Sequence, residues 1–254
     1  MRTLSLAGSA LILVLAAATL SAQQASAPQP YKAVAVKPPT LLNDPTLDAF
    51  RKDVAAAAQR KDRAALARMV VAKGFFWERM DGKGADDKKS GIDNLAAALN
   101  LDAKDGSGWE ALAAAVGEGK ASPDPQNKGV ACAPALPDVD DKAFDALIRD
   151  TNSDPSEWGV PNAPGVEVRA APKADAPVVE KLGLVLIRGV VDDSPLNAVE
   201  GTNTEWLRVV TPSGKTGYVA LAEVSAVVGD QICYLKDASG WKIIGIVGGA
   251  GDQP

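Results

Sequence analysis

The sequence of 254 residues contains no histidine, few aromatic residues and only two cysteines. Without histidine there is no Ser-His or Cys-His nucleophile pair, no imidazole general base and no imidazole metal ligand. Aromatic residues make up 5% of the chain and hydrophobic residues 46%, so the predicted cores are mainly aliphatic. Lys and Arg number 27 against 32 Asp and Glu, and the resulting net charge of −5 argues against nucleic acid as a partner, because phosphates need an excess of cations.

The N-terminus has the pattern of a secretory signal peptide. Arg2 precedes an apolar run over residues 11–20, and small residues follow. We expect residues 1–27 to form this signal peptide, with cleavage near Ala22 or Ala27 and a periplasmic location for the product. The apolar run is too short to cross ~30 Å of hydrocarbon, so no membrane anchor is expected after cleavage. Loss of Arg2 lowers the net charge from −5 to −6.

Cys132 and Cys233 are the two cysteines. An even number of cysteines in an exported protein predicts a disulfide, here one that locks two predicted domains together. Two unpaired buried thiols are the alternative. A metal site needs more ligands than two thiols, so we expect neither a metal nor another cofactor.

The first half of the chain is predicted to be helical. Residues 28–43 are rich in proline without a helical period, so they are expected to be an extended tether. A small all-α domain is then predicted over residues 44–150. Asp44 followed by Pro45 is typical of an N-cap with proline in the first helical position.

Polar caps mark further helix starts in this domain. Ser90 precedes an apolar face of helical period, and Ser107 with Glu110 matches the capping box. A last helix is predicted to start at Asp140 or Asp141.

From Gly165 onward the hydrophobic period changes to two, which is typical of strands. Turn sequences at 212–215 and 237–240 separate predicted strands. Several short strands within fewer than 100 residues favour a small barrel over residues 160–250.

Residues 166–224 resemble a bacterial SH3-like domain. The resemblance rests on the order of a strand ending in arginine, a proline loop, an aliphatic pair, a tryptophan strand and a glycine turn before a Gly-aromatic-Val sequence. The residues in these places are Arg169, Pro172, Val178, Val179, Trp206, Gly214, Gly217, Tyr218 and Val219. Two features depart from the family: a longer loop at 192–204 and an extra C-terminal hairpin at 231–248. The expected fold is therefore α+β and multidomain, an all-α domain followed by an SH3-like barrel with this extra hairpin.

The resemblance implies binding and does not imply catalysis. SH3-like modules of this kind bind peptidoglycan peptides or other proteins, so a cell-wall peptide or an envelope protein is the expected partner. Fold analogy does not name the ligand. Two alternatives remain open: a structural or regulatory subunit of a periplasmic assembly, and a carboxylate-based hydrolase in the helical domain, since 32 acidic residues offer many pairs.

A few aromatic and cationic residues of the predicted barrel are candidates for ligand binding. The simpler interpretation is that the aromatic ones pack in the core or cover its edges. The other is a shallow groove for an extended peptide or sugar, with charge from Arg169 or Lys215. The candidates are Arg169, Trp206, Lys215, Tyr218, Tyr234 and Trp241.

Three short motifs fail as chemical sites. Residues 117–122 lack the spacing and the hydroxyl of a phosphate-binding loop. The acidic segment that starts at Asp81 has Ile92 where a calcium loop needs a carboxylate. Ser239 and Lys242 have the Ser-x-x-Lys spacing but lie in a predicted hairpin turn.

Overall fold

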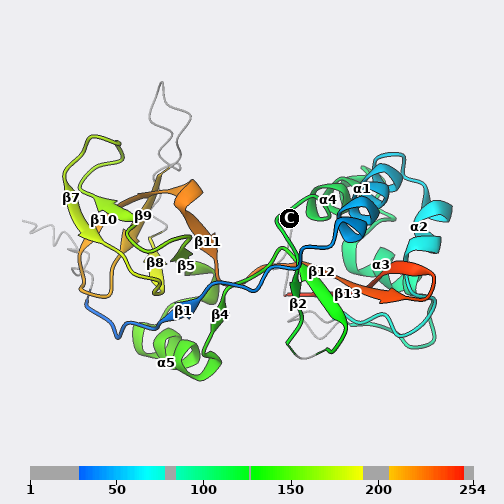
Figure 1. Cartoon of the computed structure of the whole chain (residues 1–254), viewed down its shortest axis with the longest axis horizontal. Coiled ribbons are helices and arrows are strands. Elements are labelled where there is room, and N and C mark those ends of the chain that lie inside the picture. Colours follow the sequence, from blue (N-terminus) through cyan, green and yellow to red (C-terminus); the bar gives the residue numbers. More distant parts are fainter. Residues whose placement is uncertain (1–28, 78–83, 126, 191–205, 249–254) are drawn as a thin grey trace, which may run out of the picture.

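The computed structural model describes residues 29–77, 84–125, 127–190 and 206–248. They form two lobes, each built around antiparallel sheet (Figure 1). We call one the helical lobe, made of four helices on a four-stranded sheet, and the other the sheet lobe, made of a seven-stranded sheet with one helix. The predicted α+β class is confirmed. The predicted signal peptide lies outside the described residues, and within them no helix has the length and apolar character needed to cross a bilayer.

The helices begin largely where the sequence predicts. Helix α1 starts after Asp44, whose carboxylate accepts the N–H of Thr46, and Ser90 and Asp140 cap two others. The capping box at Ser107 is wrong. Gly106 takes the N-cap position without a side-chain cap, and Ser107 donates its N–H and hydroxyl to Asp105 instead. The helices are α1 (Pro45–Gln59), α2 (Arg63–Met69), α3 (Gly91–Leu99), α4 (Ser107–Ala115) and α5 (Asp141–Thr151).

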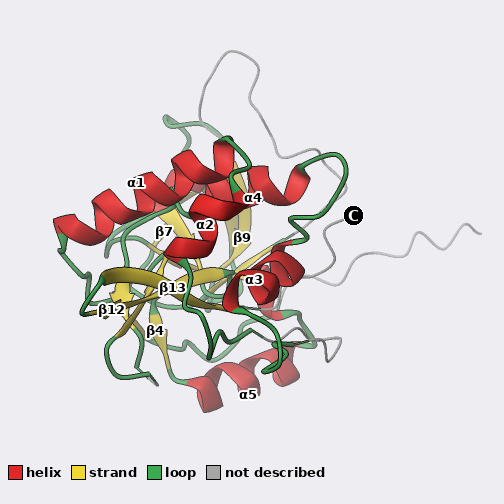
Figure 2. Ribbon diagram, turned by 90° about the vertical axis from the view of Figure 1, so that its right-hand side faces the viewer, coloured by secondary structure: helices red, strands yellow, loops and turns green. Residues whose placement is uncertain are grey.

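The helical lobe contains a sheet, so the prediction of an all-α first domain is wrong. Its strands are β2 (Ser122–Pro123), β3 (Val130–Ala133), β12 (Gln231–Asp237) and β13 (Gly240–Val247), in the order β13-β12-β3-β2. The segment 70–76 runs parallel to β13 along its other edge. Viewed onto this lobe, α1, α2 and α4 lie above β12 and β13 (Figure 2).

The C-terminal hairpin β12–β13 belongs to the helical lobe. The prediction that it extends the barrel domain expected over residues 160–250 is wrong. Strand β12 pairs with β3, and Ile232, Tyr234 and Ile243 share one apolar core with Leu47 of α1 and Leu95 of α3. Burial of these side chains in the core of the helical lobe holds the hairpin in that lobe.

The sheet lobe has seven antiparallel strands. They are β5 (Trp158–Pro161), β6 (Glu167–Arg169), β7 (Val178–Lys181), β8 (Ile187–Gly189), β9 (Trp206–Val210), β10 (Thr216–Ala220) and β11 (Val224–Ala226), in the order β11-β5-β8-β9-β10-β6-β7. Short 3₁₀ turns, η1 (Pro155–Glu157) and η2 (Leu221–Glu223), precede β5 and β11.

The inner face of this sheet surrounds one aliphatic core. Val168, Val209 and Val219 are fully buried in it, and Val179 of edge strand β7 and Val224 of edge strand β11 pack against the same cluster. The sheet is therefore strongly curled. Among the described strands β7 and β11 remain separate edges, and no closed barrel is detected.

The N-terminal segment and α5 cover part of the outer face. Val34 and Val36 are 6% and 5% exposed and pack with Phe144 of α5 and Trp158 of β5. Strand β1 (Val36–Lys37) also pairs with β4 (Asp138–Val139). The expected tether is thus extended as predicted but is part of the fold, because its alternate valines have an apolar surface to cover.

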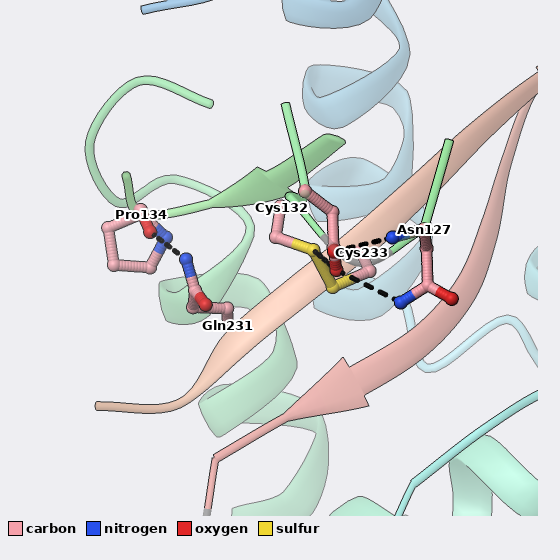
Figure 3. The surroundings of a disulfide bond; sticks show 6 residues. Asn127, Cys132, Pro134, Gln231 and Cys233 are labelled. Carbon is pink, nitrogen blue, oxygen red and sulfur yellow. Dashed lines mark hydrogen bonds between the residues drawn. A yellow bond between two sulfur atoms is a disulfide. The ribbon is translucent and has the colours of Figure 1, made fainter. Parts of the chain in front are cut away.

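The predicted disulfide is present between Cys132 and Cys233 (Figure 3). The two cysteines lie directly opposite each other on β3 and β12, so both belong to the helical lobe. The expectation that the bond joins the two domains is therefore wrong. Beside it, the amide of Gln231 donates to the carbonyl of Pro134 at 2.6 Å. The bond closes a loop of 101 residues that contains the seven strands of the sheet lobe.

Candidate functional site

The six predicted site residues divide between the two lobes. Tyr234 and Trp241 lie on β12 and β13 of the helical lobe, whereas the other four lie on or beside strands of the sheet lobe. A single groove formed by all six does not exist. The predicted turn at 237–240 places Trp241 at the tip of the β12–β13 hairpin, opposite Lys236.

Tyr234 is a core residue. It has no exposed surface, and its ring meets Phe50 edge-on at 6.1 Å between centroids. Burial raises the pKa of Tyr234 to about 12, while the nearby Arg51 guanidinium lowers it by a smaller amount. A side chain enclosed in this way packs the lobe and does not contact a ligand.

Trp241 links the hairpin to the start of α1. Its indole N–H donates to the hydroxyl of Thr46 at 3.0 Å, and Lys236 lies 5.3 Å above its ring. Lys236 also pairs with Asp44 at 3.1 Å. The hydrogen bonds of Thr46 and Lys236 to Asp44 hold the pKa of that carboxyl at about 2. Trp241 is half-buried in this network, which connects the β12–β13 hairpin to the start of α1.

Lys215 is held by contacts within the sheet lobe. Its ammonium group lies 3.8 Å from Glu180 and donates to the carbonyl of Val179 at 3.3 Å. The same carboxylate accepts hydrogen bonds from Thr211 at 2.9 Å and Ser213 at 2.6 Å. These contacts fasten β7 to the turn between β9 and β10.

Arg169 and Tyr218 do come together, on the outer face of the sheet lobe. Tyr218 on β10 is the direct register partner of Arg169 on β6 and of Arg208 on β9. Directly opposite residues of antiparallel strands point to the same face, so the tyrosine lies between two arginines. All three are half-buried and keep part of their surface accessible. We call this set the outer-face row. Arg208 is not among the residues predicted from the sequence, because its place beside Tyr218 depends on strand register.

The surroundings of the outer-face row show what it offers to a ligand. Arg169 pairs with Glu167 and donates to the carbonyl of Ala176 at 2.8 Å, which fixes its guanidinium plane. Hydrogen bonds and charge from Lys181, together with Arg169, hold the pKa of Glu167 below its usual range. Trp206 lies on the same face, opposite Ala220, but is only 7% exposed and acts as packing.

Two of the clefts on the described surface bear on the predicted hydrolase alternative. One, of about 230 Å³, is bounded by the N-terminal segment 30–34 and helix α5, and the carboxylate in its lining is Asp150. The other, of about 420 Å³, is wide open beside Phe75 and Trp77, and its carboxylate is Asp87. Neither lining contains the pair of carboxylates that glycoside hydrolysis requires.

One cluster has metal-ligand side chains. The carboxylate of Asp124 and the sulfurs of Cys132 and Cys233 lie within 4.8 Å of one another. The sulfurs are bonded to each other in the disulfide, whereas a thiolate is what a metal ion coordinates. In this oxidised state the cluster does not offer a ligand set.

Comparison with protein-family models, with curated proteins and with solved structures finds no match. Function is therefore inferred from the chemistry of the sites described above.

Proposed function

We propose that this is an exported, non-catalytic binding protein whose sheet lobe recognises a component of the cell envelope. The observation that carries the proposal is the outer-face row, in which Tyr218 lies between Arg169 and Arg208. A peptide of the bacterial cell wall is the favoured ligand. An envelope protein is the other expected partner.

The row suits a ligand that has both carboxylates and apolar or sugar surfaces. Guanidinium groups bind carboxylates in a planar, bidentate way, and a tyrosine ring offers a flat apolar face with a polar tip. Neighbouring strands are about 4.8 Å apart, so the two arginines lie on strands about 10 Å apart. An extended peptide crossing β6, β10 and β9 would meet a cation, a ring and a second cation in turn.

We further propose that the sheet lobe is an SH3-like unit. Its curled sheet with one aliphatic core supports this, as does the pairing of its first strand β5 with its last strand β11. The segments that carry the resemblance all lie within this lobe. A closed barrel is not required for this proposal, because β7 and β11 remain separate edges among the described strands.

The disulfide supports export, and the net charge bears on how the ligand is bound. The disulfide is consistent with an oxidising compartment, where such bonds persist. The net charge of −5 is unfavourable for electrostatic adhesion to anionic lipids or wall polymers. Binding should therefore depend on short-range contacts and survive moderate salt.

The first experiment is a pull-down of the purified mature protein on isolated peptidoglycan sacculi, at low and at moderate salt. We expect the wild-type protein to be retained at both. Tyr218→Ala and Arg208→Ala should each reduce retention about ten-fold or more, as expected for an interface hot spot. Trp241→Ala is the matched aromatic control, because Trp241 lies in the helical lobe, and it should be retained like the wild type.

Circular dichroism of each variant would verify that the fold is intact. No retention of the wild type would refute recognition of the cell wall and leave the envelope protein, which crosslinking in cells through the same face would identify. Equal loss by Trp241→Ala would refute the outer-face row as the site.

A further inference from the structure

The cleft between the N-terminal segment and α5 has features of a second binding site. It lies on the sheet lobe, where the N-terminal segment runs beside the helix (Figure 1). Val34 and Leu147 contribute buried apolar surface to it, and Ala143 and Ala146 present small side chains on α5. Two alanines at this helical spacing leave the space open, since larger residues there would fill it.

The walls of this cleft are held in place by contacts within the fold. The hydroxyl of Tyr31 lies 2.9 Å from the carbonyl of Val210 and 3.1 Å from that of Leu186, and its ring packs edge-on against Trp158 at 5.1 Å. The hydroxyl of Thr151 donates to the carbonyl of Leu147 at 2.7 Å. A cleft with walls fixed in this way is formed before a ligand binds.

The charged groups of the cleft are Lys32 and Asp150, one on each wall. Within the described part of the chain, neither side chain makes a hydrogen bond or an ion pair, whereas the hydroxyls of Tyr31 and Thr151 are occupied. Lys32 can receive a carboxylate and Asp150 an ammonium group. The cleft therefore combines an apolar floor with one free charge of each sign.

We propose that this cleft binds a short peptide of small residues with both ends free, its carboxylate at Lys32 and its ammonium group at Asp150. The size supports a small ligand, because about 230 Å³ is below the range of drug-sized pockets and suits two or three residues such as alanine. The apolar surfaces of Ala143, Ala146 and Leu147 would contact the methyl groups. The site is separate from the outer-face row, and the proposal does not depend on that row.

The test is a titration of the ¹⁵N-labelled mature protein, followed by NMR, with L-Ala-L-Ala and separately with D-Ala-D-Ala, each up to about 10 mM. This concentration exceeds the millimolar affinity expected of so small a ligand. We expect shifts of the amides in segment 30–34 and along α5. Stronger binding of L-Ala-L-Ala would indicate a protein-derived peptide, and stronger binding of D-Ala-D-Ala a wall-derived one. Either result supports the proposal.

Blocked dipeptides test the two charges. Acetylation of the amino group or amidation of the carboxylate should each weaken binding about three-fold to five-fold, the range of a partly exposed ion pair. Asp150→Asn should remove the effect of acetylation, and Lys32→Met the effect of amidation. The matched controls are Asp145→Asn and Lys142→Met, exposed residues of the same helix that do not line the cleft, and both should bind like the wild type.

Ala146→Leu fills the cleft and should weaken binding ten-fold or more without changing the rest of the amide spectrum. The proposal is overturned by unchanged binding in this variant or by equal affinity for blocked and free dipeptides. Absence of shifts with both stereoisomers would overturn it as well. None of these outcomes bears on retention by sacculi through the outer-face row.

Discussion

Arg51 is a buried charge that joins α1 to the segment that follows α4. It is 6% exposed, and its guanidinium donates to the carbonyl of Gly119 at 2.9 Å and to the carbonyl of Glu118. These carbonyls lie in the connection between α4, which ends at Ala115, and β2, so a side chain of α1 satisfies backbone acceptors of that connection. The arginine thus fixes the segment after α4 against α1.

Replacement of Arg51 by methionine should lower the free energy of unfolding by about 2 kcal/mol, because two hydrogen bonds from a charged donor are lost while the apolar stem is kept. Lys52→Met is the matched control, an exposed neighbour whose change should stay within about 0.5 kcal/mol. Urea unfolding of both variants measures the difference. Equal stability of the two would show that the carbonyls find other donors.

Tyr234 gives the helical lobe a sensitivity to alkaline pH. Its pKa of about 12 in the fold exceeds the value near 10 of an unfolded chain. The unfolded state therefore loses its proton first as the pH rises from 10 to 12. The contribution of Tyr234 to the free energy of unfolding is fully present below pH 10 and should decrease by about 2–3 kcal/mol by pH 12.

Tyr234→Phe should remove this part of the pH dependence. At neutral pH the variant should be at least as stable as the wild type, because within the described part of the chain the hydroxyl of Tyr234 makes no hydrogen bond. Burial also raises the pKa of Tyr31, so some alkaline loss should remain. Urea unfolding at pH 8, 10 and 11 measures it, with Tyr218→Phe as control. If the free energy of unfolding of Tyr234→Phe falls with pH as steeply as that of the wild type, the alkaline loss does not come from Tyr234.

At the scale of single residues, the sequence predicts chemistry better than position. The disulfide partners and the N-caps at Asp44 and Ser90 follow from residue type and local spacing alone. Tyr234 and Arg208 could not be placed in this way. Whether a strand residue is enclosed or lies beside a particular neighbour depends on register with strands distant in sequence.

At the scale of elements, the same distinction separates helices from sheets. The helices whose starts are marked in the sequence, α1, α3, α4 and α5, are predicted because a polar start and an apolar face lie within one segment, although the cap expected at Ser107 is wrong. The sheet of the helical lobe is missed, because β3 and β12 are about a hundred positions apart and short apolar strands do not specify their partners. The turn at 237–240 predicts the hairpin correctly and leaves its partner open.

The pairing of β3 with β12 is the contact that the disulfide secures. In the chain-entropy model a bond that closes a loop of 101 residues contributes about 4.7 kcal/mol. The double variant Cys132→Ala/Cys233→Ala should therefore lose about 3–5 kcal/mol in urea unfolding. In hydrogen exchange, protection should decrease first at the amides of β3 and β12, whereas the amides of β9 and β10 should stay protected longest. Equal loss across both lobes would contradict a bond that acts within the helical lobe.

At the scale of the whole molecule, the two lobes are interleaved along the chain. The sheet lobe takes residues 29–37 and then the segment from β4 to β11, while the helical lobe takes α1 to β3 and then the hairpin β12–β13. The expected order of one domain after another therefore does not describe the molecule. The hairpin returns because its apolar face completes the core under the helices.

This interleaving predicts which lobe depends on the C-terminus. A chain that ends at Asp230 lacks Ile232, Tyr234 and Ile243, each buried in the helical lobe. Burial of such side chains contributes about 1.5–3 kcal/mol each, a sum comparable to the whole stability of a small domain. The truncated chain should lose most of the helical signal in circular dichroism, since α1 to α4 lose their sheet. The amides of β9 and β10 should remain protected, because their core contains no residue after β11. If instead the helical signal survives and the sheet lobe unfolds, the hairpin is not what completes the helical lobe.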